Sequence, residues 1–200
     1  MNIKVSKGNS KIGDIPSVSL PAGVTCRGDC ECTWKCYARR IERLRKSVRK
    51  AYEHNYDLLN NHPDIFWREV EATIMMSRFF RFHVSGDIPN ADYLKQIVDI
   101  SAKNPHCQIL CFTKKYDIVN SYLDTRKILP ENLHLVFSVW RNLVCDNRHN
   151  LPEAHVRYRD GTTTARCDAV QCSGNCTECA ITDGGCWTLQ KGEQVVFDEH

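Results

Sequence analysis

The segment FFRFHVSGDIPNADYLKQIVDISAKNPHCQILCFT, residues 79–113, decides the fold class. It opens with aromatic and β-branched residues and then reaches Ser-Gly-Asp, which predicts a strand over residues 79–84 followed by a turn. Apolar residues recur at three- and four-residue spacing over residues 90–103, which predicts a helix. Residues 108–113 are a second apolar run of strand length. A strand, a crossover helix and another strand indicate a parallel βαβ unit.

The same alternation extends outward from this unit in both directions. Residues 17–20 alternate in polarity and predict a short strand, and residues 33–61 predict one long charged helix. A further helix is expected to begin at Pro63, because proline is favoured at the first helical position. Residues 115–124 predict a helix and residues 133–139 another strand. Such units are too few for a full eight-stranded barrel, so we expect an α/β fold with a partial (β/α) barrel or an open parallel sheet.

The regular pattern ends after Arg141. Residues 145–166 contain Gly, Pro, Asn and Asp with little apolar repetition, which predicts a long loop. This loop leads to a cysteine-rich segment. We therefore expect an α/β core with an N-terminal cysteine cluster over residues 1–150, and a cysteine-rich, metal-binding C-terminal lobe over residues 151–200.

The composition fits one globular domain, with 200 residues, 42% hydrophobic and 26% charged. The net charge of +3 is too small to predict nucleic-acid binding by itself. No stretch approaches the roughly 18 apolar residues of a membrane span, and the N-terminus lacks an apolar signal segment, so we expect a cytoplasmic protein without membrane partners. In a reducing compartment, closely spaced cysteines are more often metal ligands or redox groups than disulfides, which disfavours a disulfide-stapled secreted domain.

Five of the 12 cysteines form the C-terminal cysteine group. Its members are Cys167, Cys172, Cys176, Cys179 and Cys186. Thiolates two residues apart, as in the Cys176–Cys179 pair, can bind one metal, and nearby glycines leave room for the necessary turns. The spacing predicts an iron–sulfur cluster or a tetrahedral zinc site. A site of four ligands uses either Cys167 with the last three cysteines or the set that starts at Cys172.

The N-terminal cysteine group places four thiols within eleven residues. Its members are Cys26, Cys30, Cys32 and Cys36. The group follows a predicted strand and precedes a predicted helix, whose N-terminal N–H groups favour thiolates and a negatively charged cluster. Three or four of these cysteines are available as ligands, and a cubane cluster with three leaves one iron open to substrate. A zinc knuckle is the alternative. The remaining cysteines, Cys107, Cys111 and Cys145, are expected in the core.

Polar residues cluster where the strand over residues 79–84 ends. Arg81 and His83 have the same strand parity and are expected on one face, Gly86 permits a close backbone approach, and Asp87 is placed to bind an amine or hydroxyl. Because the carboxyl ends of parallel strands line the ligand crevice, Arg81, His83 and Asp87 are candidate catalytic residues. Ser85, Gly86 and Asp87 are candidate cofactor-binding residues. The alternative is a structural histidine and a turn aspartate.

Further polar residues follow the next two strands of the predicted sheet. They are Thr113, Lys114, Lys115, Ser138, Trp140 and Arg141. These side chains would complete one polar pocket facing the N-terminal cysteine group, or are ordinary loop residues.

The predicted helix over residues 33–61 combines an apolar stripe with a basic face. The stripe contains Tyr37, Ile41, Leu44, Val48, Tyr52 and Tyr56. The basic face, over residues 39–50, contains Arg39, Arg40, Arg43, Arg45, Lys46, Arg49 and Lys50. This face is a candidate contact for nucleic acid, whose phosphates attract clustered Lys and Arg. A solvated surface with intrahelical ion pairs such as Glu42 to Lys46 explains it equally well.

Several of these segments resemble a phage and mobile-element family known as gene product 88. The matching segments are Leu20-Pro-Ala-Gly23 leading into Cys26, Cys32-Thr-Trp-Lys-Cys36-Tyr-Ala38, Arg81 to Asp87 with Tyr93, Phe112-Thr-Lys114, and Cys176-x2-Cys179 to Cys186-Trp187. The resemblance spans most of the chain. It implies a phage-associated protein in the cytoplasm of a bacterial host and points to no particular activity.

The order of parts also resembles radical S-adenosylmethionine enzymes. In that family three cysteines after the first strand bind a cubane cluster, the open iron holds the cofactor, and a Gly-Gly-Glu-like segment binds the cofactor amine. Ser85-Gly86-Asp87 occupies the latter place here. The usual Cys-x3-Cys-x2-Cys is replaced by Cys26-x3-Cys30-x-Cys32-x3-Cys36, a departure that bears directly on cofactor cleavage.

These patterns lead to two hypotheses of different classes. The first is a phage-associated protein with one or two iron–sulfur clusters of the 4Fe-4S type, possible use of S-adenosylmethionine, and redox or radical chemistry on an unknown substrate. Its preferred first-cluster ligands are Cys26, Cys32 and Cys36, with Cys30 left open. The second is a zinc-stabilised module that binds nucleic acid or protein without catalysis.

Overall fold

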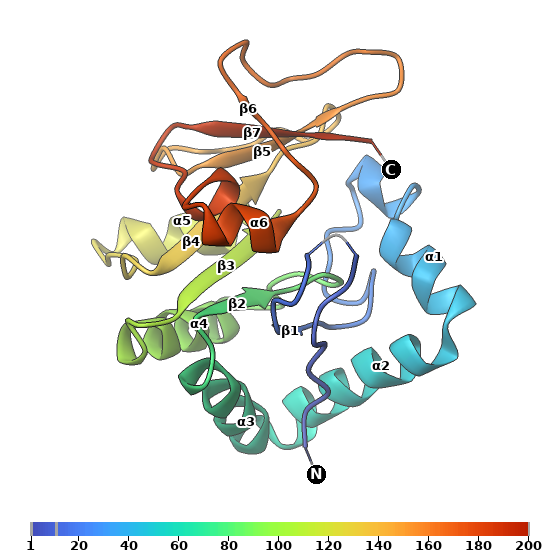
Figure 1. The fold of residues 1–200 in the computed structure, drawn as a ribbon, viewed down its shortest axis with the longest axis vertical. Helices are drawn as coiled ribbons and strands as arrows, with labels where there is room; N and C mark the ends of the chain where they lie inside the picture. Colours follow the sequence, from blue (N-terminus) through green and yellow to red (C-terminus); the bar gives the residue numbers. More distant parts are fainter. Residues whose placement is uncertain (1, 11, 200) are drawn as a thin grey trace.

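The computed structural model describes residues 2–10 and 12–199 and shows an α/β protein (Figure 1). Over these residues the sheet has seven strands in the order β1-β2-β3-β4-β5-β7-β6, and every neighbouring pair is parallel. The strands are β1 (Ser17–Val18), β2 (Phe79–Phe82), β3 (Gln108–Thr113), β4 (Leu133–Ser138), β5 (Glu153–Arg157), β6 (Val170–Gln171) and β7 (Gln194–Asp198). The helices are α1 (Tyr37–Leu44), α2 (Lys46–Asn61), α3 (Pro63–Met75), α4 (Ala91–Lys103), α5 (Tyr116–Asp124) and α6 (Cys176–Ile181). Short 3₁₀ turns span Glu31–Thr33 and Gly185–Trp187.

The βαβ unit predicted for residues 79–113 is confirmed as β2, α4 and β3. Phe80 and Phe82 of β2 lie opposite Ile109 and Cys111 of β3 in parallel register. The helix α4 begins where Asn90 caps it, because the Asn90 side chain accepts a hydrogen bond of 2.9 Å from the backbone N–H of Tyr93. Pro63 opens α3 as predicted.

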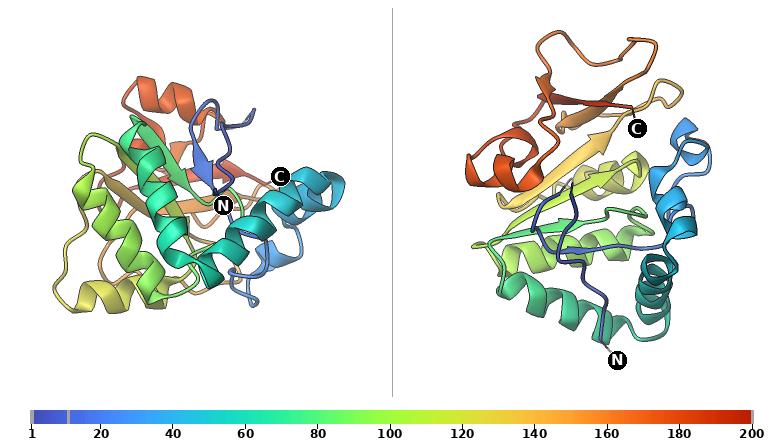
Figure 2. Two further views of the ribbon diagram at one scale, coloured as in Figure 1. Left: turned by 90° about the horizontal axis from the view of Figure 1, so that it is seen from below. Right: turned by 45° about the vertical axis from the view of Figure 1, so that its right-hand side comes forward.

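Two apolar cores lie on opposite faces of the sheet. The helix-side core joins alternate strand residues such as Phe80 and Ile109 to α3, α4 and α5. The cysteine-side core joins the intervening strand residues, such as Leu110 and Val136, to α6 and Trp187. Figure 2 shows the same arrangement, with α6 on the opposite side of the sheet from α3 and α4. This alternation follows from the two-residue period of a strand.

The parallel sheet is confirmed, and its form is open among the described residues. The edge strands are β1 and β6, and their register partners are β2 and β7 respectively, so the sheet does not close into a barrel there. Within the same residues, no helix combines the length and the apolar character that a membrane span requires.

The prediction of one long helix over residues 33–61 is wrong. The helical segment starts only at Tyr37 and is interrupted at Arg45, whose φ of −122° and ψ of 91° are extended. The two halves are anchored to different parts of the molecule. Glu42 of α1 accepts hydrogen bonds from the strand-end loops, whereas the buried Asn55 of α2 bonds to the backbone of Lys4 and Ser19. Tertiary contacts therefore override a helix-compatible sequence.

The prediction of a continuous loop over residues 145–166 is also wrong, because β5 lies within it. Ala154 and Val156 face the cysteine side, and the residue between them is the buried His155, whose ring nitrogens bond to Thr164 and Glu153. The strands β6 and β7 were not predicted either. Through β5, β7 and β6 the last part of the chain continues the same sheet as β1 to β4.

Candidate functional site

A cavity of about 520 Å³ lies at the carboxyl ends of the strands, between the two cysteine groups. Its walls include Arg81 of β2, residues 83–87, Lys114 after β3, and Ser138 and Trp140 after β4. Seven cysteines line it, namely Cys26, Cys32, Cys36, Cys172, Cys176, Cys179 and Cys186. The crevice predicted at the strand ends therefore exists, and both cysteine groups face it.

The N-terminal cysteine group divides into three cavity-lining thiols and one buried thiol. Cys30 is fully buried and belongs to the helix-side core, and it does not line the cavity. The Cys36 side chain caps α1, accepting from the backbone N–H of Arg39 at 3.5 Å, as the predicted position at a helix N-terminus requires. The sulfur of Cys26 accepts from the backbone N–H of Gly23 at 3.4 Å. The three preferred ligands are thus the three that share the cavity.

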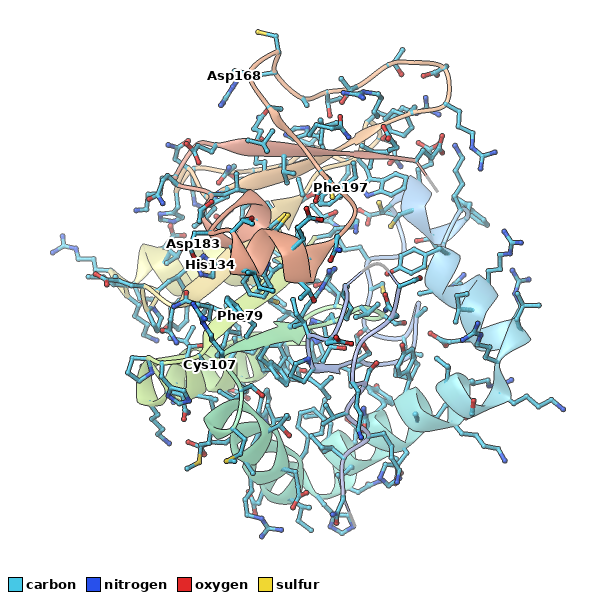
Figure 3. All side chains as sticks on the ribbon, viewed as in Figure 1. Phe79, Cys107, His134, Asp168, Asp183 and Phe197 are labelled. Atoms are coloured by element: carbon cyan, nitrogen blue, oxygen red, sulfur yellow. The ribbon has the colours of Figure 1, made fainter. Side chains whose placement is uncertain are left out.

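The C-terminal cysteine group also divides, but its spare member lies outside. Cys167 is exposed and does not line the cavity, and its neighbour Asp168 lies at the outer tip of a long loop (Figure 3). The other four pack against the cysteine-side core. Of the two ligand sets left open by the spacing, the structure brings together the one that starts at Cys172.

Local geometry around the C-terminal group depends on a glycine. Gly185 has φ +58°, and a Cβ added to it would lie 2.9 Å from the sulfur of Cys179. A larger residue would push this thiol out of position. The sulfur of Cys172 accepts from the backbone N–H of Gly174 at 3.4 Å, and Ser173 Oγ lies 3.2 Å from the sulfur of Cys179.

The thiols share the cavity without forming a preassembled metal site. Over residues 2–10 and 12–199, no group of three or more Cys, His, Asp or Glu side chains converges closely enough to hold a metal ion. Burial is the main cause that raises the pKa of the Cys26 and Cys176 thiols, and it raises the pKa of Cys186 to about 12. A metal would have to displace the protons of these thiols and draw their sulfurs together.

Arg81 connects the sheet to the C-terminal cysteine group. Its Nη1 donates to the sulfur of Cys176 at 3.6 Å, and its guanidinium lies over the ring of Phe112, 4.9 Å from the centroid. The buried Nε atom has no hydrogen-bond partner among the described residues. A half-buried guanidinium whose buried Nε donor is unused, beside a thiol, is suited to an anionic group.

Lys114 supplies a second cation at the N-terminal cysteine group. Burial lowers the pKa of its ammonium, but the charges of Cys32, Asp87, Cys30 and Cys26 offset this, so that the pKa is raised overall. The ammonium also lies 5.9 Å from the centroid of the Trp140 ring. The expectation that Lys114 and Trp140 help to line the pocket is confirmed.

His83 is held by neighbours that leave its ring little freedom. Its Nε2 lies 3.0 Å from the Tyr93 hydroxyl, its Nδ1 lies 4.0 Å from the Cys111 sulfur, and its ring stacks on Tyr93. Burial lowers its pKa to about 3, so the imidazole is neutral. The prediction that Arg81 and His83 share a face is wrong: His83, at φ +61° after the end of β2, contacts Tyr93 and Cys111 of the helix-side core, whereas Arg81 points to the cysteine side, although both residues line the cavity.

The Ser85-Gly86-Asp87 segment lines the cavity but is also bound internally. Ser85 Oγ donates to Glu42 at 2.8 Å, and the Asp87 carboxylate accepts from Thr113 Oγ1 at 2.6 Å and from the Lys114 N–H at 2.9 Å. A Cβ on Gly86 would lie 2.9–3.0 Å from atoms of residues 20 and 25. The close approach predicted for Gly86 is therefore to the loop that precedes the N-terminal cysteine group. Asp87 ties β2 to the end of β3.

The remaining cysteines and polar residues occupy other positions. Cys107 and Cys111 are buried in the helix-side core as predicted, and Cys145 packs partly buried against it. Thr113 and Lys115 do not line the cavity, and Arg141 belongs to a neighbouring polar network. Sequence reasoning missed the apolar wall from β5 and β7, which includes Val156, Val195 and Phe197.

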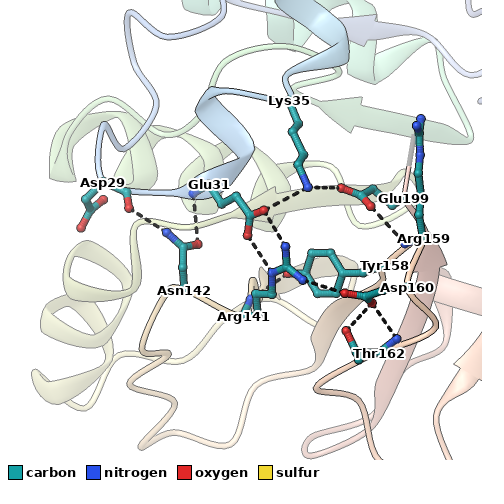
Figure 4. Close-up of polar contacts among 10 residues, drawn as sticks. All are labelled: Asp29, Glu31, Lys35, Arg141, Asn142, Tyr158, Arg159, Asp160, Thr162 and Glu199. Carbon is teal, nitrogen blue, oxygen red and sulfur yellow. Dashed lines mark hydrogen bonds and ion pairs between the residues drawn. The ribbon is translucent and has the colours of Figure 1, made fainter.

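The polar network joins the N-terminal cysteine group to the end of β7 (Figure 4). Glu31 pairs with Lys35 and Arg141, each at 3.0 Å, and Lys35 also pairs with Glu199 at 2.7 Å. Asn142 donates to the carbonyl of Asp29. The strand β7 and the N-terminal cysteine group are thereby held together at one edge of the cavity.

The sequence model described as gene product 88 matches residues 2–188, almost the whole chain. The chain belongs to the gene product 88 family. It is 28% identical over 152 residues to the Gene 88 proteins of Mycobacterium phage L5 and Mycobacterium phage D29. Each match covers 68% of this chain and 62% of the relative, so the chain spans less than two thirds of the length of these relatives. No solved structure matches the chain.

The part of the chain that matches the gene product 88 family contains all seven cavity-lining cysteines together with Arg81 and Lys114. The strand β7 lies beyond the matched residues. The cavity of this gene product 88 protein is therefore built mainly from the part of the chain that defines the family, and β7 adds one wall.

Proposed function

We propose that this chain is an iron–sulfur protein with two metal–sulfur sites that face one cavity. Cys26, Cys32 and Cys36 hold the first cluster, and the set Cys172, Cys176, Cys179 and Cys186 holds the second site. The observation that carries the proposal is the gathering of these seven thiols, from opposite ends of the chain, around one cavity at the strand ends.

The charges around the cavity favour iron–sulfur clusters. A cluster ligated by cysteine thiolates carries net negative charge, and hydrogen bonds to its sulfurs tune its reduction potential. Arg81 and Lys114 place two cations against the two groups, and N–H donors reach the sulfurs of Cys26, Cys36 and Cys172. These features suit thiolates and clusters better than neutral thiols.

The first cluster is the proposed seat of chemistry. Cys26, Cys32 and Cys36 line the cavity whereas Cys30 does not, so these three would bind the cluster, and a cubane with three protein ligands would leave one iron open to substrate. In radical S-adenosylmethionine enzymes, which the order of parts resembles, the open iron holds that cofactor. Arg81, Lys114 and the backbone of residues 85–87 would then line its surroundings. The proposed chemistry of this cluster is redox or radical chemistry in the host cytoplasm.

The second candidate function is a zinc-stabilised binding module. It rests on one observation, the four C-terminal cysteines that pack together on the cysteine-side core beside Gly174, Gly184 and Gly185. Four cysteines on tight turns form tetrahedral zinc sites that stabilise a fold without catalysis.

Anaerobic purification with iron, sulfide and zinc analysis and visible absorption separates the two functions. We expect a brown protein with at least about four iron per chain. The triple variant Cys26→Ser/Cys32→Ser/Cys36→Ser should lose the first cluster alone, and Cys176→Ser/Cys179→Ser the second site alone. Cys167→Ser, the matched control, should keep the full metal content. A colourless protein with stoichiometric zinc would reject the iron–sulfur proposal in favour of the binding module.

Cofactor use is tested on the reduced protein. Cleavage of S-adenosylmethionine that disappears in the N-terminal triple variant and persists in Cys167→Ser would support radical chemistry. A first cluster ligated by four cysteines, together with no cleavage, would reject it.

A further inference from the structure

The outer surface of the α1–α2 corner, residues 34–50, is the strongest unexplained feature of the surface; its first part, residues 35–38, also lines the cavity, whereas its basic residues 39–50 do not. In Figure 1 the two helices meet at the edge of the molecule, away from the strands β3 to β7. Seven basic residues and one acidic residue fall within residues 39–50, so the rest of the chain is net acidic. All seven basic residues are exposed. The positive charge of the chain is therefore concentrated at this corner.

The acidic residue does not neutralise this surface. Glu42 is half-buried and turned inward, where it accepts hydrogen bonds from the backbone N–H of Ala22 at 3.0 Å and from Ser85 Oγ at 2.8 Å. Arg49 pairs with Glu53 at 2.7 Å, a pair on the α2 side of the corner. The intrahelical pair expected between Glu42 and Lys46 is not formed. A solvated surface balanced by ion pairs is thus a poor description of the corner.

Exposed apolar side chains lie among these charges. Trp34 is 85% exposed, and Leu44 is 69% exposed although the sequence pattern placed it on the apolar stripe of the predicted helix. Trp34 directly follows the 3₁₀ turn Glu31–Thr33, three residues before α1 begins, and lies between Cys32 and Cys36 of the N-terminal cysteine group. An exposed indole a few residues from a run of exposed arginines offers a ring on which an unpaired base can stack.

We propose that the α1–α2 corner binds single-stranded nucleic acid, independently of whether the cavity holds metal. Arg and Lys along α1 and the start of α2 contact successive phosphates, and Trp34 stacks on a base. The helix break at Arg45 argues against a duplex, because it interrupts the straight basic helix that would lie in a major groove. A second copy of the chain is disfavoured because two such surfaces repel each other.

The test is fluorescence anisotropy of a labelled oligothymidine of 20 nucleotides, titrated with the full chain as purified. We expect binding at 50 mM salt that weakens steeply as salt rises, since counterions are released from the strand. Arg39→Gln/Arg43→Gln should lower the slope of log affinity against log salt by about 1.4, at roughly 0.7 per phosphate contact. Arg68→Gln/Lys103→Gln, with the same charge change on α3 and α4, should leave the slope unchanged.

The aromatic contact is tested separately. Trp34→Leu should weaken binding about 10-fold, within the range of one base stacked on an aromatic ring, while Trp34→Phe should retain most of the affinity. Ile128→Ala, at another exposed apolar residue, is the control. Absence of binding at 50 mM salt, equal binding of a duplex, or equal competition by poly-L-glutamate would overturn the proposal, the last of these in favour of an acidic protein partner.

Discussion

The two cysteine groups differ in where each leaves its spare thiol and its tryptophan. In the N-terminal group Cys30 is buried in the helix-side core and Trp34 is exposed. In the C-terminal group Cys167 is exposed and Trp187 is buried. The N-terminal group thus buries its spare thiol and presents its aromatic ring outward, whereas the C-terminal group buries its ring and leaves its spare thiol exposed. Cysteine spacing alone does not show this difference.

Trp187→Ala should have the largest effect on stability. The Trp187 indole packs edge-on against Phe79 and near His134, two side chains that point toward the C-terminal segment (Figure 3), and its Nε1 donates to the carbonyl of Cys176. Removing a buried Trp costs about 3–5 kcal/mol. Denaturant unfolding should show this loss, and Trp34→Ala should stay within about 0.5 kcal/mol of the parent. Equal losses in the two variants would contradict the contrast.

Glycine-to-alanine substitutions should cause the next largest losses of unfolding free energy. The loss should differ between the two cysteine groups, because the added Cβ contacts different atoms in each. At Gly86 the Cβ meets the side chain and backbone of Leu20, whereas at Gly185 it meets the side chain of Cys179. Both residues have positive φ, which costs about 1–2 kcal/mol for an alanine. We expect Gly86→Ala to lose about 2–4 kcal/mol and Gly185→Ala about 1–2 kcal/mol in chemical unfolding. Gly161→Ala, at positive φ with open space around it, measures the cost of φ alone.

Substituting the two spare cysteines, Cys30 and Cys167, should change the free energy of unfolding by smaller amounts. Cys30→Ala removes a fully buried sulfur, so we expect a loss of about 1–2 kcal/mol, whereas Cys167→Ala should be neutral. Thermal unfolding of both variants, with metal content measured on the same samples, checks this. Loss of metal in Cys30→Ala without loss of stability would make Cys30 a ligand and would reverse its assignment to the core.

The elements that the sequence predicted are those with strong apolar periodicity. The βαβ unit of residues 79–113 was predicted because Phe80, Ile97 and Ile109 recur at strand or helix spacing and are fully buried. The strand β5 was missed because its buried His155 is accommodated by hydrogen bonds to Glu153 and Thr164, which a periodicity count does not register. The break at Arg45 was missed for a similar reason, since it comes from tertiary contacts of Glu42 and Asn55.

The sequence predicted which residues belong to the candidate site, but it did not predict how their side chains are arranged. Strand-end logic placed Arg81, Asp87 and Lys114 around one pocket. The positive φ of His83, which ends the strand alternation, has no sequence signal comparable to a glycine. Which cysteine of each group would face away depended on the packing of distant elements, so spacing left both choices open.

Removing a charge from the polar network between the N-terminal cysteine group and β7 should have the smallest effect on stability. That effect should depend on pH. Hydrogen bonds from the Lys35 ammonium and from the Arg159 N–H hold the pKa of the Glu199 carboxyl below its usual value. A carboxyl whose pKa is lower in the folded state stabilises above the unfolded pKa of about 4.3, and this contribution is lost as pH falls through the folded pKa. Glu199→Gln should therefore lower Tm at pH 7 by no more than about 2 °C.

The difference in Tm between parent and Glu199→Gln should shrink as pH is lowered from 7 to 3, and it should also shrink in 0.5 M salt because the pair is near solvent. Calorimetry at both salt concentrations measures this, with Glu131→Gln, at an exposed position before β4, as the control. A difference that persists at pH 3 would mean that Glu199 acts through shape rather than charge. The edge of the cavity at the N-terminal group would then be held by packing, as the C-terminal group is held by Trp187.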